Sequence, residues 1–143
     1  MPEEPITALP QLHHVVFAVA AARHAAAAQM FSDLGFVFET LQLTELGLDI
    51  HLDWNRGIEL ISPIPGSAGE VTGSVTEFLE RHGDGVYTVV IGVPEASSAE
   101  AVAERYSATT RFRQHFEGEG SYLDENDVSI LGLPLTFLAT NIP

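Results

Sequence analysis

The sequence predicts an α+β fold made of two βαβββ modules, with curved mixed sheets around a central cup. Two strand-like segments, "LHHVVFAV" (12–19) and "VYTVVIGV" (86–93), resemble one another, and their equivalent positions His14 and Thr88 lie 74 residues apart. A helical segment follows each of them, and further strand-like segments follow each helix. A single period of this length indicates duplication of one unit rather than a solenoid of many.

The first module is predicted to run strand, helix and three strands. Its helix is expected over 20–34, where alanine dominates, and Gly35 stands where a C-terminal cap belongs. The strand segments are rich in β-branched and aromatic residues or alternate apolar with polar residues, and "NRG" (55–57) forms a hairpin turn. The strands are expected at 12–19, 36–43, 48–54 and 58–63.

A linker and a short helix separate the modules. Residues 64–73 are rich in Pro, Gly and Ser, and a helix is expected over 74–83, where Ser74 and Glu77 have capping-box spacing. The predicted organisation is one domain with a flexible lead at 1–11, the first module at 12–63, the linker with its helix at 64–85 and the second module at 86–143.

The second module repeats the pattern. Its helix is expected over 97–107, where Ser97 and Glu100 form another capping box. The residues of this helix at i, i+3, i+4 and i+7 are expected to face the core: Ala99, Val102, Ala103 and Tyr106. Its strands are expected at 86–93, at 109–116, between 117 and 131, and at 133–140.

Composition and charge exclude several functions. The chain has 143 residues, no cysteine and a net charge of −14, and its six basic residues are all arginine. The lack of lysine excludes Schiff-base chemistry on a side-chain amine, and the acidic balance disfavours nucleic acid as a partner. No apolar run is long enough for a membrane span, and the acidic start "MPEEPITALP" does not resemble a signal peptide, so we expect a cytoplasmic protein.

The motifs together resemble the vicinal oxygen chelate superfamily, which includes glyoxalase I, methylmalonyl-CoA epimerase, ring-cleaving dioxygenases and bleomycin-resistance proteins. The resemblance covers about residues 12–140 and rests on four motifs: "LHHVVFAV", "DLGFVFET", "GIELISP" and "FLERHGDGVYTVVIGV". The last motif is most similar to the epimerases and to the N-terminal half of hydroxyphenylpyruvate dioxygenases. The resemblance implies the glyoxalase/bleomycin-resistance fold, a homodimer and a small-molecule ligand.

The resemblance also implies a divalent metal such as zinc, nickel, manganese or iron. It places one ligand on the first strand and one on the last strand of each module, which here are His14, Glu59, Thr88 and Thr136. His14 and Glu59 keep ligand chemistry, whereas a neutral threonine hydroxyl is a poor ligand beside imidazole and carboxylate. The implied metal site is therefore incomplete, and the metal is expected to be weakly held or absent.

Other side chains are candidates to complete the site. His51 and Asp53 alternate on one face of their strand, His115 lies on a strand of the second module, and Tyr87 precedes Thr88. We expect Glu59 to act as a general base, with His14 or His51 as the acid. His24 and His82 are expected to face solvent.

Two functions follow from these residues. The first is a glyoxalase- or epimerase-like lyase or isomerase that acts next to a carbonyl and has a degenerate metal site. The alternative is a metal-free binding protein of the bleomycin-resistance type, which would sequester a cationic or aromatic small molecule. The acidic composition and the two missing ligands fit this alternative. Coenzyme A esters are disfavoured as substrates by their negative charges, although Arg111 and Arg113 offset these locally.

Overall fold

The computed structural model describes residues 10–43 and 46–143, so the predicted lead at 1–11 lies almost entirely outside the described residues. The chain divides into two compact units. The first unit is His14–Tyr87. The second unit is Thr88–Pro143 together with the described residues up to His13. In the part of the chain that is described, no helix has the length and apolar character needed to cross a membrane.

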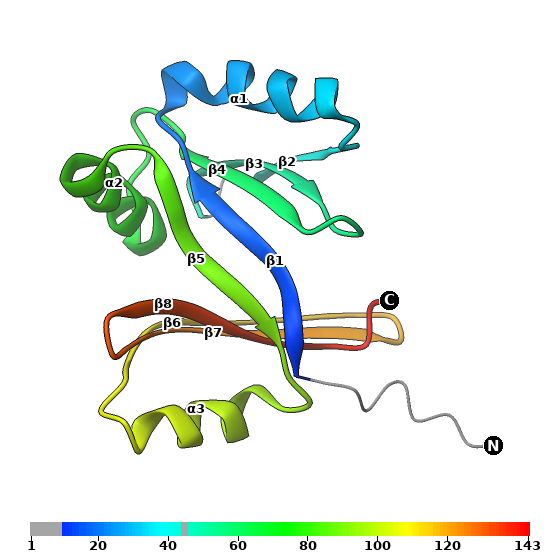
Figure 1. Cartoon of the computed structure of the whole chain (residues 1–143), viewed down its shortest axis with the longest axis vertical. Helices are drawn as coiled ribbons and strands as arrows, with labels where there is room; N and C mark the ends of the chain where they lie inside the picture. The colour runs from blue at the N-terminus through cyan, green and yellow to red at the C-terminus, as the bar shows by residue number, and fades with distance from the viewer. Residues whose placement is uncertain (1–9, 44–45) are drawn as a thin grey trace. The chain divides into compact units, whose positions relative to one another are not determined.

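The first unit is a four-stranded mixed sheet with a helix over one face (Figure 1). Its elements are β1 (Gln11–Ala18, of which the part from His14 on belongs to this unit), α1 (Ala21–Leu34), β2 (Glu39–Leu43), β3 (Leu48–Asp53), β4 (Ile58–Pro63) and α2 (Glu70–His82). The strand order is β2-β3-β4-β1, and β1 runs parallel to β4 while the other pairs are antiparallel. Beneath α1, the buried residues Val19, Ala28 and Leu60 form a core that Phe17 and Phe31 extend.

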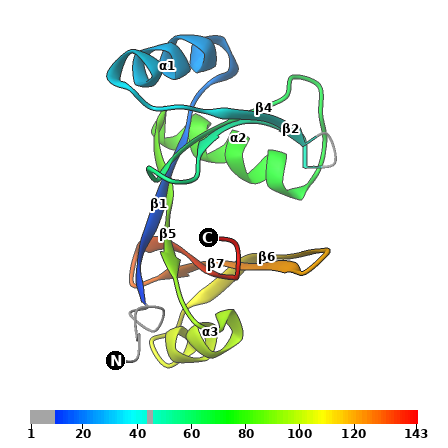
Figure 2. The same cartoon turned by 90° about the vertical axis from the view of Figure 1, so that its right-hand side faces the viewer.

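The second unit has the same connectivity. Its elements are β5 (Gly85–Gly92, of which the part from Thr88 on belongs to this unit), α3 (Ala96–Glu104), β6 (Thr109–Gly118), β7 (Ser121–Ile130) and β8 (Leu133–Thr140). The strand order is β5-β8-β7-β6, with β5 parallel to β8 and the other pairs antiparallel. Figure 2 shows the long hairpin of β6 and β7, with α3 along one face of this sheet.

Strand register confirms the predicted α+β fold of two βαβββ modules. In the first unit Val15 pairs with Ile58, and in the second unit Val89 pairs with Leu135. Val89 stands 74 positions after Val15, as the repeat requires. The pairing of β1 with β4 in the first unit therefore has the same register as the pairing of β5 with β8 in the second.

The strand predicted at 36–43 begins later than expected, at Glu39. Gly35 takes a left-handed conformation (φ 111°) and caps α1 as predicted, and Phe36 N–H then donates to Phe31 O at 3.1 Å. Val37 N–H donates to the carboxylate of Asp53 at 2.9 Å. Because the N–H groups of residues 35–37 are engaged in these contacts, they do not pair with β3, and the strand starts only at Glu39.

The helix α2 begins at Glu70, inside the stretch predicted as a linker, so Ser74 is an interior residue and its capping box is wrong. Thr72 explains the earlier start, because its hydroxyl donates to Leu46 O at 2.7 Å and joins the first turn of the helix to the turn before β3. At this turn Gly47 has φ +70°, and a Cβ there would lie 2.0 Å from Thr72 Oγ1. The linker is therefore held against the first unit by a close contact that admits only glycine.

The core-facing residues of α3 differ from the prediction. Ala96, Glu100 and Ala103 are buried, whereas Val102 and Tyr106 are exposed, and the expected cap at Ser97 does not form because Glu95 occupies the N-cap position. Glu100 replaces an apolar residue in the buried stripe because polar partners surround it. The Arg113 guanidinium donates to it at 2.6 and 3.2 Å, Asn126 Nδ2 donates at 3.0 Å, and the Thr110 hydroxyl also donates.

Asp53 ends β3 with a buried carboxylate, and we expect it to make unfolding sensitive to acid. Burial raises the pKa of this carboxyl, but the N–H groups of Val37 and Arg56 and the Arg56 guanidinium outweigh that effect and hold it below its ordinary value. A depressed carboxyl pKa stabilises the fold above the unfolded pKa of about 3.9, and this contribution is lost as pH falls through the folded value.

The substitution Asp53→Asn is therefore expected to lower the free energy of unfolding at pH 7 by about 1–3 kcal/mol, because it leaves buried donors without a charged acceptor. It is also expected to flatten the dependence of unfolding on pH below about 5. Urea denaturation between pH 3 and 7 measures both effects. An equally steep acid dependence in the variant would assign the effect to other carboxylates, such as Asp84, which Arg23 binds at 2.6 Å.

Candidate functional site

The candidate site is built on the pairing of β1 with β4. These strands run parallel with Val16 opposite Glu59, and His14 and Glu59 meet on one face of the sheet. His14 Nε2 lies 2.8 Å from Glu59 Oε1. The His14 side chain is 2% exposed and the Glu59 side chain 17%, so the histidine is buried behind a carboxylate that solvent reaches. The Trp54 ring lies 6.1 Å from the imidazole, between ring centroids.

The equivalent positions of the second unit form a neutral pair. Thr88 Oγ1 lies 3.0 Å from Thr136 Oγ1, and Thr136 Oγ1 donates to Asp127 Oδ1 at 2.9 Å. Because the single hydroxyl proton of Thr136 goes to Asp127, the Thr88 hydroxyl is the donor to Thr136. Both threonines are buried. Where the first unit pairs imidazole with carboxylate, the second unit satisfies the same two positions with hydroxyls.

The substitution Thr88→Val tests whether this pair has a structural role. Valine has a similar shape but no donor, so Thr136 loses one hydrogen bond and keeps its bond to Asp127. We expect the free energy of unfolding to fall by about 0.5–1.5 kcal/mol. Urea denaturation measures the change, and Thr40→Val, at an exposed position of β2, serves as the control. A loss no larger than that of the control would show that the hydroxyl pair does not contribute to stability.

His51 does not join Glu59, so the predicted pairing of these two residues is wrong. Register places His51 opposite Leu60, and directly opposite residues share a face, so Glu59 points to the other side of the sheet. His51 Nδ1 instead lies 2.8 Å from His24 Nε2. His24 is buried rather than solvent-facing as predicted, because it also meets Ser62 Oγ at 2.6 Å.

The remaining candidates Tyr87, Asp53 and His115 have partners other than His14 and Glu59. Tyr87 packs edge-on against Phe78, and its hydroxyl lies 2.6 Å from Ser74 Oγ, so it belongs to the packing of α2. Asp53 holds the chain turn at Val37 and Arg56. His115, in the second unit, pairs with Asp124 on the neighbouring strand, and this contact raises the pKa of its imidazole.

Solved structures share this architecture over nearly the whole chain. A methylmalonyl-CoA epimerase variant from Streptomyces coelicolor, bound to 2-nitronate-propionyl-CoA, aligns over 94% of this chain and 100% of its own, with a TM-score of 0.65 and 16% identity. Methylmalonyl-CoA epimerase from Mycobacterium tuberculosis aligns over 90% and 87%, with a TM-score of 0.62 and 18% identity. The chain has the fold of the vicinal oxygen chelate superfamily.

In one longer protein, the same architecture makes up about half of the chain. A variant of 4-hydroxymandelate synthase from Streptomyces coelicolor aligns over 92% of this chain but 48% of its own, with a TM-score of 0.66 and 16% identity. No protein-family model and no curated protein matches the sequence. The likeness is thus one of vicinal oxygen chelate architecture at low sequence identity.

The residues at the four positions that the sequence resemblance implies as metal ligands do not form a complete set of good ligands. The first unit has an imidazole and a carboxylate at its two positions, and the second unit has two neutral hydroxyls that already bond to one another. Within residues 10–43 and 46–143, no three His, Cys, Asp or Glu side chains converge as a metal site would require. His14 and Glu59 form an imidazole–carboxylate pair in the first unit.

Sequence reasoning missed two polar groups of the second unit. Asp127 binds Thr136 only because β7 and β8 pair in a register that sets these residues opposite one another. The capping-box spacing assigns Glu100 to a helix cap, whereas it is the buried centre of a cluster with Arg113 and Asn126. An acidic residue within an otherwise apolar helical stripe was the only signal in the sequence for this cluster.

Proposed function

We propose that the chain is an epimerase-like isomerase that moves a proton at a carbon next to a carbonyl, with Glu59 as the base and without a bound metal. The observation that carries the proposal is the 2.8 Å contact between His14 Nε2 and Glu59 Oε1, with the carboxylate at the exposed end of the pair. The similarity to methylmalonyl-CoA epimerases supports the reaction class, since structures of those enzymes hold 2-nitronate-propionyl-CoA or methylmalonyl-CoA.

The pair suits this reaction in two ways. In the tautomer that carries its proton on Nε2, His14 donates to one oxygen of Glu59, which orients the carboxylate and leaves its other oxygen to accept a proton. When the carbon–hydrogen bond breaks, the proton passes to Glu59 and the electron pair moves onto the carbonyl oxygen. As Glu59 takes up the proton, the hydrogen bond from His14 Nε2–H holds the carboxyl group in place. Return of a proton to the planar carbon completes the exchange, and isomerisation follows when the intermediate turns its opposite face to Glu59 before the proton returns.

This proposal is favoured over ligand sequestration because a buried histidine behind a partly exposed carboxylate is what proton transfer requires. Sequestration of a cation needs only the carboxylate. The net charge of −14 and the engagement of Arg113 by Glu100 also favour a substrate with few negative charges. We therefore propose a small carbonyl compound or a short thioester in preference to a full coenzyme A ester.

Deuterium exchange tests the proposal directly. The chain is incubated in heavy water with three compounds that carry an acidic α-hydrogen: methylmalonyl-CoA, the matching pantetheine thioester and a 2-substituted 3-oxo acid ester. Loss of the α-proton signal is followed by NMR, with and without EDTA. We expect exchange of at least one compound at the same rate in EDTA, and faster exchange of the pantetheine thioester than of the coenzyme A ester.

Two results would contradict the proposal. Failure of all three compounds to exchange would remove the reaction class. Exchange that EDTA abolishes and a divalent metal restores would show that the chain holds a metal after all.

A further inference from the structure

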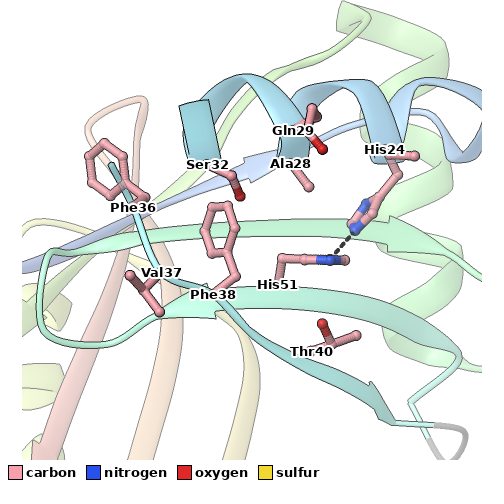
Figure 3. Close-up of a pocket in the computed structure, with 10 residues that line it drawn as sticks. His24, Ala28, Gln29, Ser32, Phe36, Val37, Phe38, Thr40 and His51 are labelled. Atoms are coloured by element: carbon pink, nitrogen blue, oxygen red, sulfur yellow. Dashed lines mark hydrogen bonds between the residues drawn. The ribbon is translucent and has the colours of Figure 1, made fainter. Parts of the chain in front are cut away.

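A pocket of about 530 Å³ lies between α1 and the strands β2 and β3, within the first unit (Figure 3). Its residues come from α1 (Ala28, Gln29), from the segment after it (Phe36, Phe38) and from β3 (His51). His51 shares a sheet face with Leu60, and Glu59 lies on the opposite face. The pocket is therefore separate from the His14–Glu59 pair, and nothing in the proposed reaction uses it.

A chain of hydrogen bonds under the pocket fixes which ring nitrogens carry protons. Ser62 Oγ lies 2.5 Å from Val19 O, and a carbonyl oxygen only accepts, so the serine hydroxyl donates there. His24 Nδ1, 2.6 Å from the same Ser62 Oγ, must then be the donor to it. Burial and the neighbouring His51 lower the pKa of the His24 imidazole, so near pH 7 this ring is neutral and its Nε2 is bare.

The same logic extends to His51. A bare His24 Nε2 accepts a proton from His51 Nδ1, which lies 2.8 Å away. In its neutral form His51 then has no proton on Nε2. Figure 3 shows His24 and His51 pointing toward one another, with His51 among the residues that line the pocket. The pocket thus contains a hydrogen-bond acceptor, and Ser62 and His24 orient it from behind.

The remaining lining limits the kind of ligand. Among the described residues that line the pocket there is no Asp, Glu, Lys or Arg, so none of them offers a charged partner to an anion or a cation. Phe38 stands edge-on to His51 with ring centroids 5.6 Å apart, and Phe36 and Ala28 add apolar surface. The volume is within the range of small-molecule sites. An aromatic ring fits such a surface, and one O–H group fits the bare nitrogen.

We propose that this pocket is a second small-molecule site, which binds an uncharged aromatic ligand with one hydroxyl donor, and that His51 Nε2 accepts the hydrogen of that hydroxyl. His24 and Ser62 are positioning residues that act through His51.

Matched ligands test the proposal on the full chain. NMR shift titrations compare 4-methylphenol with 4-methylanisole, which has the same ring but no donor. We expect 4-methylphenol to shift the signals of Ala28, Phe38 and His51 saturably. We also expect the ether to bind several-fold more weakly, by up to about tenfold, as the loss of one hydrogen bond predicts. In His51→Phe the two ligands should bind equally, whereas His82→Phe, the same exchange at an exposed position of α2, should keep the difference.

A long-range proton–nitrogen correlation spectrum of the unsubstituted chain supplies a readout that does not depend on the variants folding. We expect the neutral His51 ring to carry its proton on Nδ1 and none on Nε2. The opposite tautomer, equal affinity for the phenol and the ether, or shifts confined to residues outside the pocket would overturn the proposal. Exchange activity at Glu59 is measured separately, so loss of either proposal leaves the other standing.

Discussion

The substitution Glu59→Gln is expected to lower the rate of α-proton exchange by about 10²–10⁴-fold, because it removes the general base and keeps the shape of the side chain. The amide oxygen still accepts from His14 Nε2, so the hydrogen bond within the unit and the fold should persist. The rate is measured by deuterium exchange in heavy water on whichever compound the unsubstituted chain exchanges fastest.

Glu39→Gln provides the matched control, since Glu39 is an exposed residue of β2 in the same unit. It makes the same chemical change and is expected to leave the rate unaltered. Loss of a general base lowers a rate far more than about threefold. If the Glu59→Gln protein is folded by circular dichroism and its exchange rate lies within about threefold of that of the unsubstituted chain, another group carries out the proton transfer.

The substitution Glu100→Ala is expected to lower the free energy of unfolding by about 2–4 kcal/mol. The substitution removes the acceptor of the Asn126 and Thr110 donors and leaves the Arg113 guanidinium without its carboxylate partner. Arg113 is 62% exposed and recovers solvation from water, so the loss should fall at the lower end of what a fully buried pair costs. Urea denaturation at pH 7 measures it.

The stabilising contribution of Glu100 is also expected to depend on pH. The hydrogen bond from Arg113 holds the pKa of the Glu100 carboxyl below its ordinary value against the opposing effect of burial. Its stabilising contribution is therefore present above the unfolded pKa and is lost as pH falls through the lower folded value. Glu104→Ala, at an exposed position of the same helix, is the control. Equal losses for the two variants would mean that the buried cluster does not stabilise the unit.

The repeat was predictable from the sequence because its signals are local. The similarity of the segments around His14 and Thr88, the alanine-rich helix with its glycine cap and the β-branched strands all lie within short windows. Strand register then confirmed the equivalence of the two modules. That His14 meets Glu59 was expected from the resemblance to a family and not from spacing alone, because pairing of β1 with β4 joins residues 45 positions apart.

The errors arose where distant residues decide the outcome. His24 lies in an alanine-rich helix and looks exposed, but Ser62 and His51 reach it from two strands and make its burial favourable. Ser74 and Ser97 have capping-box spacing, but Thr72 moves the start of α2 and Ala96 begins α3. Local spacing describes what a segment prefers in isolation, and contacts across the unit override that preference. The predicted homodimer stays a prediction.

The contact between Gly47 and Thr72 has a practical consequence for anyone who divides this protein into fragments. A fragment that stops at Pro63, where the repeated pattern of strands ends, would lack Thr72, whose hydroxyl donates a hydrogen bond to the turn before β3. A fragment that extends to Tyr87 keeps this hydrogen bond, so the shortest fragment suited to separate expression is longer than the repeated module.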